Sequence, residues 1–146
     1  MKLMFQKLRE NAILPVRATA QSAGADLFAC LDAPLTIAPG ETVLVPLGLT
    51  CQPTRDDIAM QVYPRSGLAS KHGITLANAV GVVDSDYRGE WHVPLHNISQ
   101  TDFTVEHGMR IAQLVVTPVL FPAIEETAQV DDTARGTGGF GSSGLK

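Results

Sequence analysis

The chain contains 146 residues, of which 45% are hydrophobic and 18% are charged, and it carries a formal net charge of −4. These values predict one globular domain with its own core, and the acidic balance argues against electrostatic binding to a nucleic-acid polymer. No apolar run approaches the roughly 20 residues of a membrane-spanning helix, so no membrane partner is expected.

The N-terminal segment and the cysteines indicate the compartment. Lys2, Lys7 and Arg9 interrupt the first apolar residues, so this segment lacks the continuous apolar region of a signal peptide. Cys30 and Cys51 match no metal-ligand spacing, and we predict that both are small, buried, reduced residues. We therefore expect a cytoplasmic protein.

Short apolar segments alternate with prolines and glycines along the whole chain, which is typical of an all-β protein. One short helix is predicted, ending at Gly73. Many short strands at this spacing predict a sandwich, a jelly roll or a small barrel. The predicted strands are residues 26–31, 41–50, 58–63, 80–83, 91–98 and 110–120, and the predicted helix is residues 66–73.

The strand predicted before the last one has the clearest alternation. Trp91, Val93 and Leu95 would share one face, with His92 and His96 on the other. Pro94 cannot donate a ladder hydrogen bond, so it predicts an edge or bulged strand. The same proline rules out a regular helix that would bring both histidines to one zinc ion.

Polar residues and glycines interrupt the apolar pattern at five places, of which two lie in the first half of the chain. Asp26 opens a strand, and its local interpretation is a turn or cap residue. Arg65, Ser66 and Gly67 offer a guanidinium, a hydroxyl and free backbone N–H groups, which suit a phosphate. An N-capping serine beside a solvated arginine explains these residues equally well.

The third place follows the strand at residues 80–83 and is the most informative. Asp84 and two further acids, Asp86 and Glu90, surround Tyr87. A carboxylate held at a strand end can act as a general base on water or help to hold a metal. An acidic hairpin turn is the alternative, and we prefer it for Asp86 and Glu90.

The last two places are a glutamine in a strand and the C-terminal tail. Gln113 must find hydrogen-bond partners, from a neighbouring strand or from a ligand. The tail "RGTGGFGSSGLK" matches dinucleotide-binding and P-loop glycine patterns, but both motifs need a following helix. Arg135, Phe140, Ser142 and Ser143 would suit a nucleotide, and a disordered tail is the alternative.

In this order, the five segments resemble the five motifs of the dUTPase family, the trimeric deoxyuridine triphosphate nucleotidohydrolases. "PRSGLA", "GVVDSDYRGE" and "RGTGGFGSSG" carry the resemblance, which extends over residues 23–144. It implies a mostly antiparallel jelly-roll-like fold and a homotrimer with active sites between subunits. Within the single domain, we expect a β core at residues 1–126, then a linker and a flexible glycine-rich arm at 127–146 that closes over a neighbouring site.

The resemblance also implies a reaction, the hydrolysis of dUTP to dUMP and pyrophosphate, which limits uracil in DNA and supplies dUMP for thymidylate synthesis. Asp84 matches the catalytic carboxylate that deprotonates the water attacking the α-phosphorus. Gln113 matches a phosphate-side contact near the reacting centre. Mg²⁺ would be held chiefly by the triphosphate, with Asp26 reaching it through water.

The remaining implied roles concern substrate recognition. Asn78 and the backbone of Val82 and Val83 match the hairpin that reads uracil. Tyr87 matches the ring under the deoxyribose, which leaves no room for a ribose 2′-hydroxyl. His92 occupies a position where residue type varies, and its role is left open. The matched residues that bind phosphate, stack on the base or let the arm approach are Arg65, Ser66, Gly67, Arg135, Phe140, Gly141, Ser142 and Ser143.

Two other functions deserve comparison. A dCTP deaminase of the same fold would pair a Ser-Ser-x-Ala-Arg-like segment with a catalytic glutamate and would lack the glycine arm. This chain instead has Gly67 at the second serine and a complete arm. A non-catalytic binding or regulatory module would have lost the attacking carboxylate or the tail, and both are present.

Overall fold

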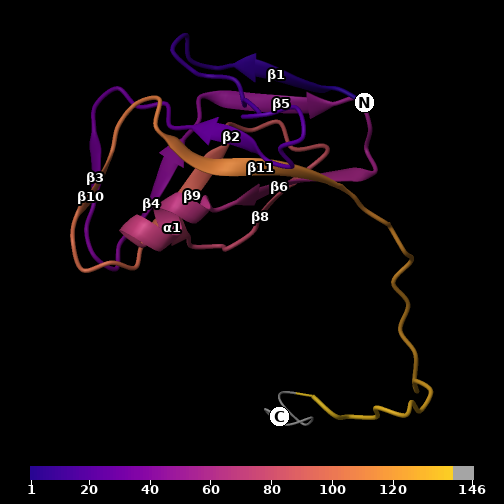
Figure 1. The fold of residues 1–146 in the computed structure, drawn as a ribbon. Helices are drawn as coiled ribbons and strands as arrows, with labels where there is room; N and C mark the ends of the chain where they lie inside the picture. Colours follow the sequence, from indigo (N-terminus) through magenta and orange to yellow (C-terminus); the bar gives the residue numbers. More distant parts are fainter. Residues whose placement is uncertain (140–146) are drawn as a thin grey trace.

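The computed structural model describes residues 1–139, which form eleven β-strands and one α-helix. Figure 1 shows the strands gathered into one body, with the helix on its surface. The expected all-β fold with one short helix is therefore confirmed. The elements are β1 (Leu3–Lys7), β2 (Ala25–Phe28), β3 (Leu35–Ile37), β4 (Thr42–Pro46), β5 (Leu49–Pro53), β6 (Ile58–Tyr63), α1 (Ser66–His72), β7 (Ile74–Leu76), β8 (Gly81–Asp84), β9 (His92–Asn97), β10 (Phe103–Val105) and β11 (Arg110–Pro118).

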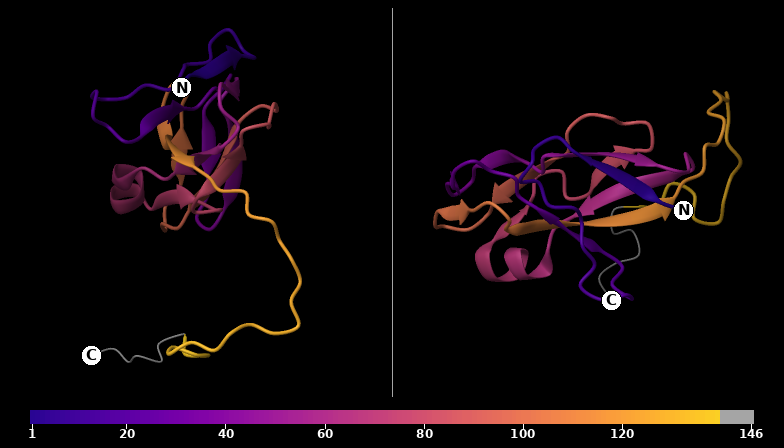
Figure 2. Two further views of the ribbon diagram at one scale, coloured as in Figure 1. Left: turned by 90° about the vertical axis from the view of Figure 1, so that its right-hand side faces the viewer. Right: turned by 90° about the horizontal axis from the view of Figure 1, so that it is seen from above.

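The strands pair antiparallel in four small sheets. The largest sheet has the order β2-β11-β6-β8, so that β2 and β8 form its two edges. The other sheets are β4-β9-β7, β1-β5 and β10-β3. Two further views show α1 on the outside of the body, and the chain after β11 leaving the body away from α1 (Figure 2).

The register of the largest sheet places the site candidates. Gln113 of β11 lies opposite Asp26 of β2 and opposite Tyr63 of β6. Ala59, at the other end of β6, lies opposite Asp84 of β8. Asp26 and Asp84 therefore lie on opposite edges of one sheet and near opposite ends of β6.

The core consists of the inward-facing apolar side chains of these sheets. Leu27, Met60 and Ile111, from three strands of the largest sheet, are fully buried. Removing such side chains from water stabilises the fold by about 1.5–3 kcal/mol each. The core therefore holds β2, β6 and β11 together and gives the residues on their outer faces a rigid support.

The alternation predicted around β9 is confirmed, whereas its predicted edge position is wrong. Trp91, Val93 and Leu95 are buried, and His92 is exposed. However, β9 lies between β4 and β7. The carbonyl of Pro94 accepts from Ala77, just beyond the end of β7. In an antiparallel sheet, the N–H and the C=O of one residue point to the same neighbouring strand. The N–H that Pro94 lacks would therefore point to the position of Ala77, where the β7 ladder has ended.

The strand predicted at residues 41–50 is two strands, β4 and β5. Between them, Gly48 adopts a φ of +66°, and a Cβ there would lie 2.8 Å from the sulfur of Cys30. The left-handed backbone turns the chain, which only glycine does without strain. The short strands β1, β3, β7 and β10 were not predicted, because segments of three to five residues are too short to show a clear periodicity.

The predicted helix is confirmed as α1, and it ends as expected. Gly73 has a φ of +64°, and its N–H donates to the carbonyl of Ala69 at 3.2 Å. This left-handed glycine terminates the helix. Among the described residues, no helix combines the length and the apolar character needed to cross a membrane.

Both cysteines are free and buried, as predicted. Burial raises the pKa of the Cys51 thiol to about 11, and it also raises the pKa of Cys30. Because the thiolate is the reactive form, both side chains behave as inert apolar groups at neutral pH.

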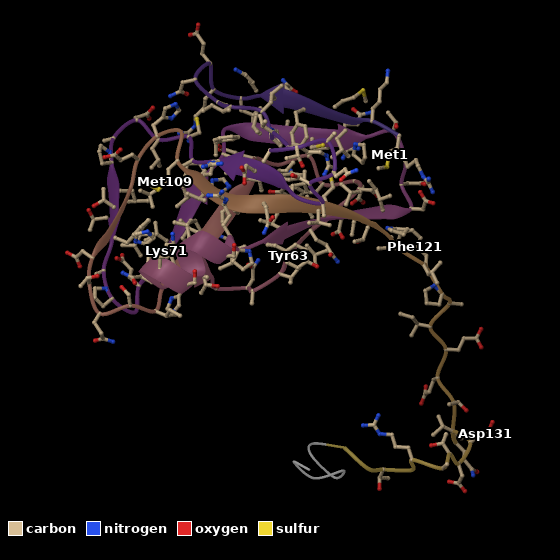
Figure 3. All side chains as sticks on the ribbon, viewed as in Figure 1. Met1, Tyr63, Lys71, Met109, Phe121 and Asp131 are labelled. Carbon is tan, nitrogen blue, oxygen red and sulfur yellow. The ribbon has the colours of Figure 1, made fainter. Side chains whose placement is uncertain are left out.

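After β11 the chain extends away from the body. Residues 119–139 contain no helix or strand, and Figure 3 shows the side chains between Phe121 and Asp131 spread along an isolated segment. Leu120, Phe121 and Ile124 are exposed apolar residues in this segment. Apolar side chains in such numbers are typical of a surface that packs against another molecule. The division of the domain at residue 126 stays a prediction.

The buried Asn97 generates a test of stability. Its Nδ2 donates to the carbonyls of Ile37 and Thr101 at 2.9 and 2.8 Å, and its Oδ1 accepts from Ser99. Replacing Asn97 by alanine leaves buried partners unsatisfied, so the free energy of unfolding should fall by about 3 kcal/mol in urea denaturation. The control Gln52→Ala, at an exposed position, should cost about 0.5 kcal/mol or less. Equal effects of the two substitutions would contradict this reasoning.

Candidate functional site

A polar cavity of about 610 Å³ lies between α1, β2 and β11. We call it the basic pocket, because Arg65, Lys71 and Arg110 line it together with one carboxylate, Asp26. Its positive balance suits an anion. The full lining is Ala18, Ser22, Ala23, Gly24, Asp26, Arg65, Ser66, Gly67, Leu68, Lys71, His72, Arg110 and Gln113.

Asp26 organises the cations of the basic pocket. Its Oδ1 lies 3.0 Å from Nε of Arg65, and its Oδ2 lies 3.3 Å from Nη1 of Arg110. The Asp26 side chain is only 16% exposed, so water screens these pairs weakly. Arg65 also donates to the carbonyl of Arg110 at 3.3 Å. One carboxylate thus holds two guanidinium groups side by side despite their mutual repulsion.

The alternative interpretation of the Arg65 segment is wrong. Arg65, not Ser66, occupies the N-cap position of α1, and no side chain caps the helix. The guanidinium of Arg65 is paired rather than solvated. The Ser66 hydroxyl is therefore not used for capping. Ser66 and Gly67 both line the basic pocket, and a Cβ added at Gly67 would meet no atom within 4 Å.

Gln113 finds its partner within the protein and still faces the basic pocket. Its Nε2 donates to the carbonyl of Pro64 at 3.0 Å. The amide nitrogen has a second N–H, which a ligand can use. A Cβ at Gly24 would lie 2.4 Å from Oε1 of Gln113, so only glycine at this position permits the observed side-chain position.

Arg110 was not identified from the sequence as a site residue. It begins β11 beside Phe28 of β2, and this pairing brings its guanidinium to Asp26. The sequence did contain a signal for this residue, because Arg110 lies three residues before Gln113 in the same predicted strand. A charged residue at the start of an apolar strand is usually solvated, so only the pairing with β2 distinguishes it.

A second cavity, of about 230 Å³, lies beside β8. We call it the strand-edge pocket. Within the described part of the chain, β8 pairs only with β6, so the backbone groups on its outer edge make no ladder hydrogen bonds. A free edge can pair with another hydrogen-bonding partner. The pocket is lined by Val82, Val83, Asp84, Tyr87, Glu90, Trp91 and His92.

The ends of β8 carry two of the predicted residues. Asn78 lies in the sharp turn before β8, where Ala79 has a φ of +50° and the amide of Val80 donates to the Asn78 carbonyl at 2.6 Å. A Cβ at Gly81 would lie 3.1 Å from Nδ2 of Asn78. Asp84 ends the strand with an exposed carboxylate that lines the strand-edge pocket.

Tyr87 folds back over the turn that follows β8. Its hydroxyl donates to the carbonyl of Glu90 at 3.2 Å. A Cβ at Gly89 would lie 2.3 Å from this hydroxyl oxygen, so glycine is required under the ring. The ring lines the strand-edge pocket and remains 46% exposed.

The predicted residues thus fall into two groups that share no pocket. Asp26, Arg65, Ser66, Gly67 and Gln113 line the basic pocket, and Val82, Val83, Asp84 and Tyr87 line the strand-edge pocket. Arg135 lies on the extended segment, where its Nε donates to the carbonyl of Gly138. Phe140, Gly141, Ser142 and Ser143 lie outside the described residues.

Sheet geometry separates Asp84 from the basic pocket of its own chain. Three inter-strand spacings lie between β2 and β8, which is roughly 14 Å. Along β6, the partners Ala59 and Tyr63 are a further roughly 13 Å apart. A general base must lie within hydrogen-bond reach of its proton, directly or through one water. One chain alone therefore does not bring Asp84 and Gln113 to one reacting group.

The chain offers little to a metal ion by itself. Among residues 1–139, no group of three or more His, Cys, Asp or Glu side chains is close enough to hold one. Mg²⁺ commonly keeps several waters and takes one or two carboxylates plus substrate phosphates. Asp26 fits that mode, because each of its paired oxygens retains a further lone pair.

The fold defines a class, the jelly-roll-like proteins of mostly antiparallel β-sheet. A family model described as dUTPase matches residues 10–144, and the chain belongs to the dUTPase family. The family that the sequence resembles is thereby confirmed.

Curated relatives and solved structures agree with this assignment. The deoxyuridine 5′-triphosphate nucleotidohydrolase of Janthinobacterium sp. (strain Marseille) is 49% identical over 98% of this chain and 95% of its own. That of Hahella chejuensis is 46% identical over 99% and 95%. A variant dUTPase of Staphylococcus bacteriophage 80alpha with dUpNHpp superposes with a TM-score of 0.88, at 23% identity and 99% coverage of both chains.

A second solved structure extends the likeness in fold. It is a variant dUTPase of phage phi11 of S. aureus, described with a structural Mg(II) ion. Its TM-score is 0.80, with 19% identity over 90% of this chain and 100% of that chain. Both structural likenesses confirm the jelly-roll-like fold of the chain.

The close approach of Gly24 and Gln113 generates a prediction. Gly24→Ala should displace the Gln113 amide, because a Cβ would meet Oε1 at 2.4 Å. Rotation of this flexible side chain should lower the free energy of unfolding by only about 1 kcal/mol, the value of one hydrogen bond. Binding of dUpNHpp, the ligand named with the phage 80alpha relative, measured by calorimetry, should weaken roughly fivefold for the same reason. Gln113→Ala should reproduce both effects, and wild-type binding by Gly24→Ala would refute the role given to Gln113.

Proposed function

We propose that this protein hydrolyses dUTP to dUMP and pyrophosphate. Its membership of the dUTPase family supports the reaction, as do curated relatives named deoxyuridine 5′-triphosphate nucleotidohydrolases. The observation that carries the proposal is the division of the site residues. One pocket gathers guanidinium groups for a polyanion, and the other sets a carboxylate beside a free strand edge.

The basic pocket binds the triphosphate in this proposal. Arg65 and the Ser66 hydroxyl contact phosphate oxygens, and Gly67 lets the backbone N–H groups approach closely. Asp26 aligns Arg65 and Arg110 before the ligand arrives, so that little of the binding free energy is lost in ordering them.

The strand-edge pocket recognises the nucleoside. The outer edge of β8, with the backbone of Val82 and Val83 and the amide of Asn78, pairs with the hydrogen-bonding edge of uracil. Cytosine presents a donor where uracil presents an acceptor, and a site that satisfies the uracil pattern rejects the wrong one strongly. Tyr87 supports the deoxyribose and leaves no room for a 2′-hydroxyl.

Asp84 acts as the general base. Its carboxylate accepts a proton from water, the water oxygen bonds to the α-phosphorus, and the bond from that phosphorus to the bridging oxygen of pyrophosphate breaks. Pyrophosphate leaves with the electron pair of the broken bond, and dUMP keeps the new oxygen. Gln113 orients the α-phosphate through its second N–H, and the guanidinium groups offset the charge that develops on the leaving group.

Mg²⁺ is the expected cofactor, and the relative from phage phi11 is described with a structural Mg(II) ion. Bound to the triphosphate, the ion supplies neutralisation of phosphate charge. Asp26 would hold it through water, because the carboxylate already pairs directly with two arginines.

A homotrimer with sites between subunits completes the proposal. The separation of Asp84 from Gln113 within one chain supports a site in which a second chain supplies one of the two pockets. A third contribution comes from the C-terminal arm, in which Arg135 holds the γ-phosphate, Phe140 stacks on uracil, and Gly141, Ser142 and Ser143 meet the phosphates. Ordering such an arm costs entropy that its ligand contacts must exceed. The cytoplasmic location predicted from the sequence suits an enzyme of soluble nucleotides.

Product analysis tests the reaction directly. With dUTP and Mg²⁺, we expect equimolar dUMP and pyrophosphate, measured by ion-exchange chromatography, and no orthophosphate. With dCTP, we expect no release of ammonia. Ammonia from dCTP would instead identify a deaminase of this fold, and binding of dUTP without any turnover would identify a non-catalytic module.

Substitution of the general base tests the mechanism. Asp84→Asn keeps the size of the side chain and removes its basicity, so kcat should fall by roughly 10²–10⁴-fold. Nucleotide binding should persist in this variant. It can be followed through the fluorescence of the sole tryptophan, Trp91, because this residue lines the same pocket as Asp84. Asp86→Asn changes the neighbouring exposed carboxylate and should leave kcat within about twofold. Near-normal turnover by Asp84→Asn would rule out its assignment as the base.

A further inference from the structure

Glu90 connects the turn that carries Tyr87 to a distant part of the fold. Its side chain is 24% exposed, and Oε1 accepts from the N–H of Gly48 at 3.1 Å. The same oxygen lies 3.6 Å from Nε of Arg9, whose Nη1 donates to the carbonyl of Cys30 at 3.3 Å. The carboxylate therefore bridges the N-terminal segment and the β4–β5 turn.

The backbone of Glu90 contacts the wall of the strand-edge pocket. Its carbonyl accepts from the Tyr87 hydroxyl at 3.2 Å and lies 3.1 Å from Nδ1 of His92. Both rings line the pocket on either side of this residue. The carboxylate of Glu90 thus connects to the body of the protein, and its carbonyl connects to the ring that faces the ligand.

We propose that Glu90, held by Arg9, is a positioning residue that sets the discrimination between deoxyribonucleotides and ribonucleotides by fixing the ring of Tyr87. The inference rests on the proposed function, in which that ring excludes the 2′-hydroxyl. Arg9 lies just before residues 10–144, which are the residues that the family model matches. The contact between Arg9 and Glu90 is therefore an observation from this structure and not from the family match.

The physical argument depends on how closely an aromatic ring must be held to exclude one hydroxyl group. The Tyr87 ring is 46% exposed, so packing alone does not immobilise it. Its hydroxyl has one protein partner among the described residues, the carbonyl of Glu90. Movement of that carbonyl therefore moves the ring, and a shift of about 1 Å is enough to change a steric selection.

The fold itself does not depend on the Glu90 carboxylate. The backbone of Trp91 pairs with Leu47 and Leu49 at 2.9 Å, and the Thr50 hydroxyl donates to the carbonyl of Arg88. These bonds keep the turn on the body when the carboxylate is removed. Loss of Glu90 should therefore affect the precision of the ring position more than the stability of the protein.

The experiment compares kcat/KM for dUTP, UTP and dCTP in the full-length protein. Glu90→Ala should lower the dUTP/UTP selectivity by roughly fivefold to tenfold, because one positioning hydrogen-bond network is lost. The dUTP/dCTP selectivity should stay within about twofold, since the β8 edge reads the base. Glu90→Gln keeps an acceptor for the Gly48 N–H and should retain most of the selectivity.

Two further variants separate positioning from a general effect. Tyr87→Phe removes the hydroxyl, and its loss of selectivity should not add to that of Glu90→Ala, because both act on one contact. Glu106→Ala, at an exposed glutamate remote from both pockets, is the matched control and should leave the selectivity unchanged.

The outcomes distinguish this inference from the proposed function. If Glu90→Ala lowers turnover of all three nucleotides equally, or keeps the wild-type dUTP/UTP ratio, the positioning role is overturned. If the purified wild-type protein does not hydrolyse dUTP, the proposed function fails first. Should Glu90→Ala fold poorly, Tyr87→Phe decides the question through the same ratio, because a wild-type dUTP/UTP ratio in this variant would show that the contact between Tyr87 and Glu90 does not set the selection.

Discussion

The arrangement of the basic pocket depends on one interaction, the pairing of the Asp26 carboxylate with Arg65 and Arg110. It joins β2, β11 and the residue before α1, three segments that are distant in the chain. Two guanidinium groups repel each other, and a weakly exposed carboxylate between them converts that repulsion into a fixed, net positive surface. Gln113, the next polar residue along β11, is placed by the same strand pairing. A preorganised, net positive pocket therefore arises from the register of two strands.

A second constraint is the position of β8 at the end of its sheet. An edge strand leaves backbone donors and acceptors unpaired, and proteins normally protect such an edge from adventitious pairing. Here the turn with Tyr87 and Glu90 covers it only in part and leaves the strand-edge pocket. Because β2 and β8 are opposite edges of one sheet, the two pockets are kept apart by the fold that creates them. This separation gives a physical reason for the proposed oligomer, since a neighbouring chain can place its β8 edge beside the β2 edge of the first chain.

Much of the fold could be predicted from local signals. The strand β6 was predicted with its observed bounds, because an apolar run lies between clear turn residues. The helix end at Gly73 was predicted, because left-handed backbone favours glycine. Pro94 misled the prediction of an edge, because the position of a proline relative to the neighbouring ladder is not a local property. Strands such as β3 and β10 were missed, because three-residue segments are stabilised by each other rather than by their own pattern.

The order and chemistry of the polar residues are written in the sequence, which sufficed to indicate the family, a segment that suits an anion and the acidic residue at the end of β8. Those signals are local, since each depends on residue type and short spacing. The tertiary structure decided which of these residues meet. It paired Arg65 with Asp26 and Arg110, placed Gly24 under Gln113, and tied Glu90 to Arg9. Such contacts follow from strand register and chain crossing, in which a shift of one residue would turn each side chain to the opposite face of its sheet.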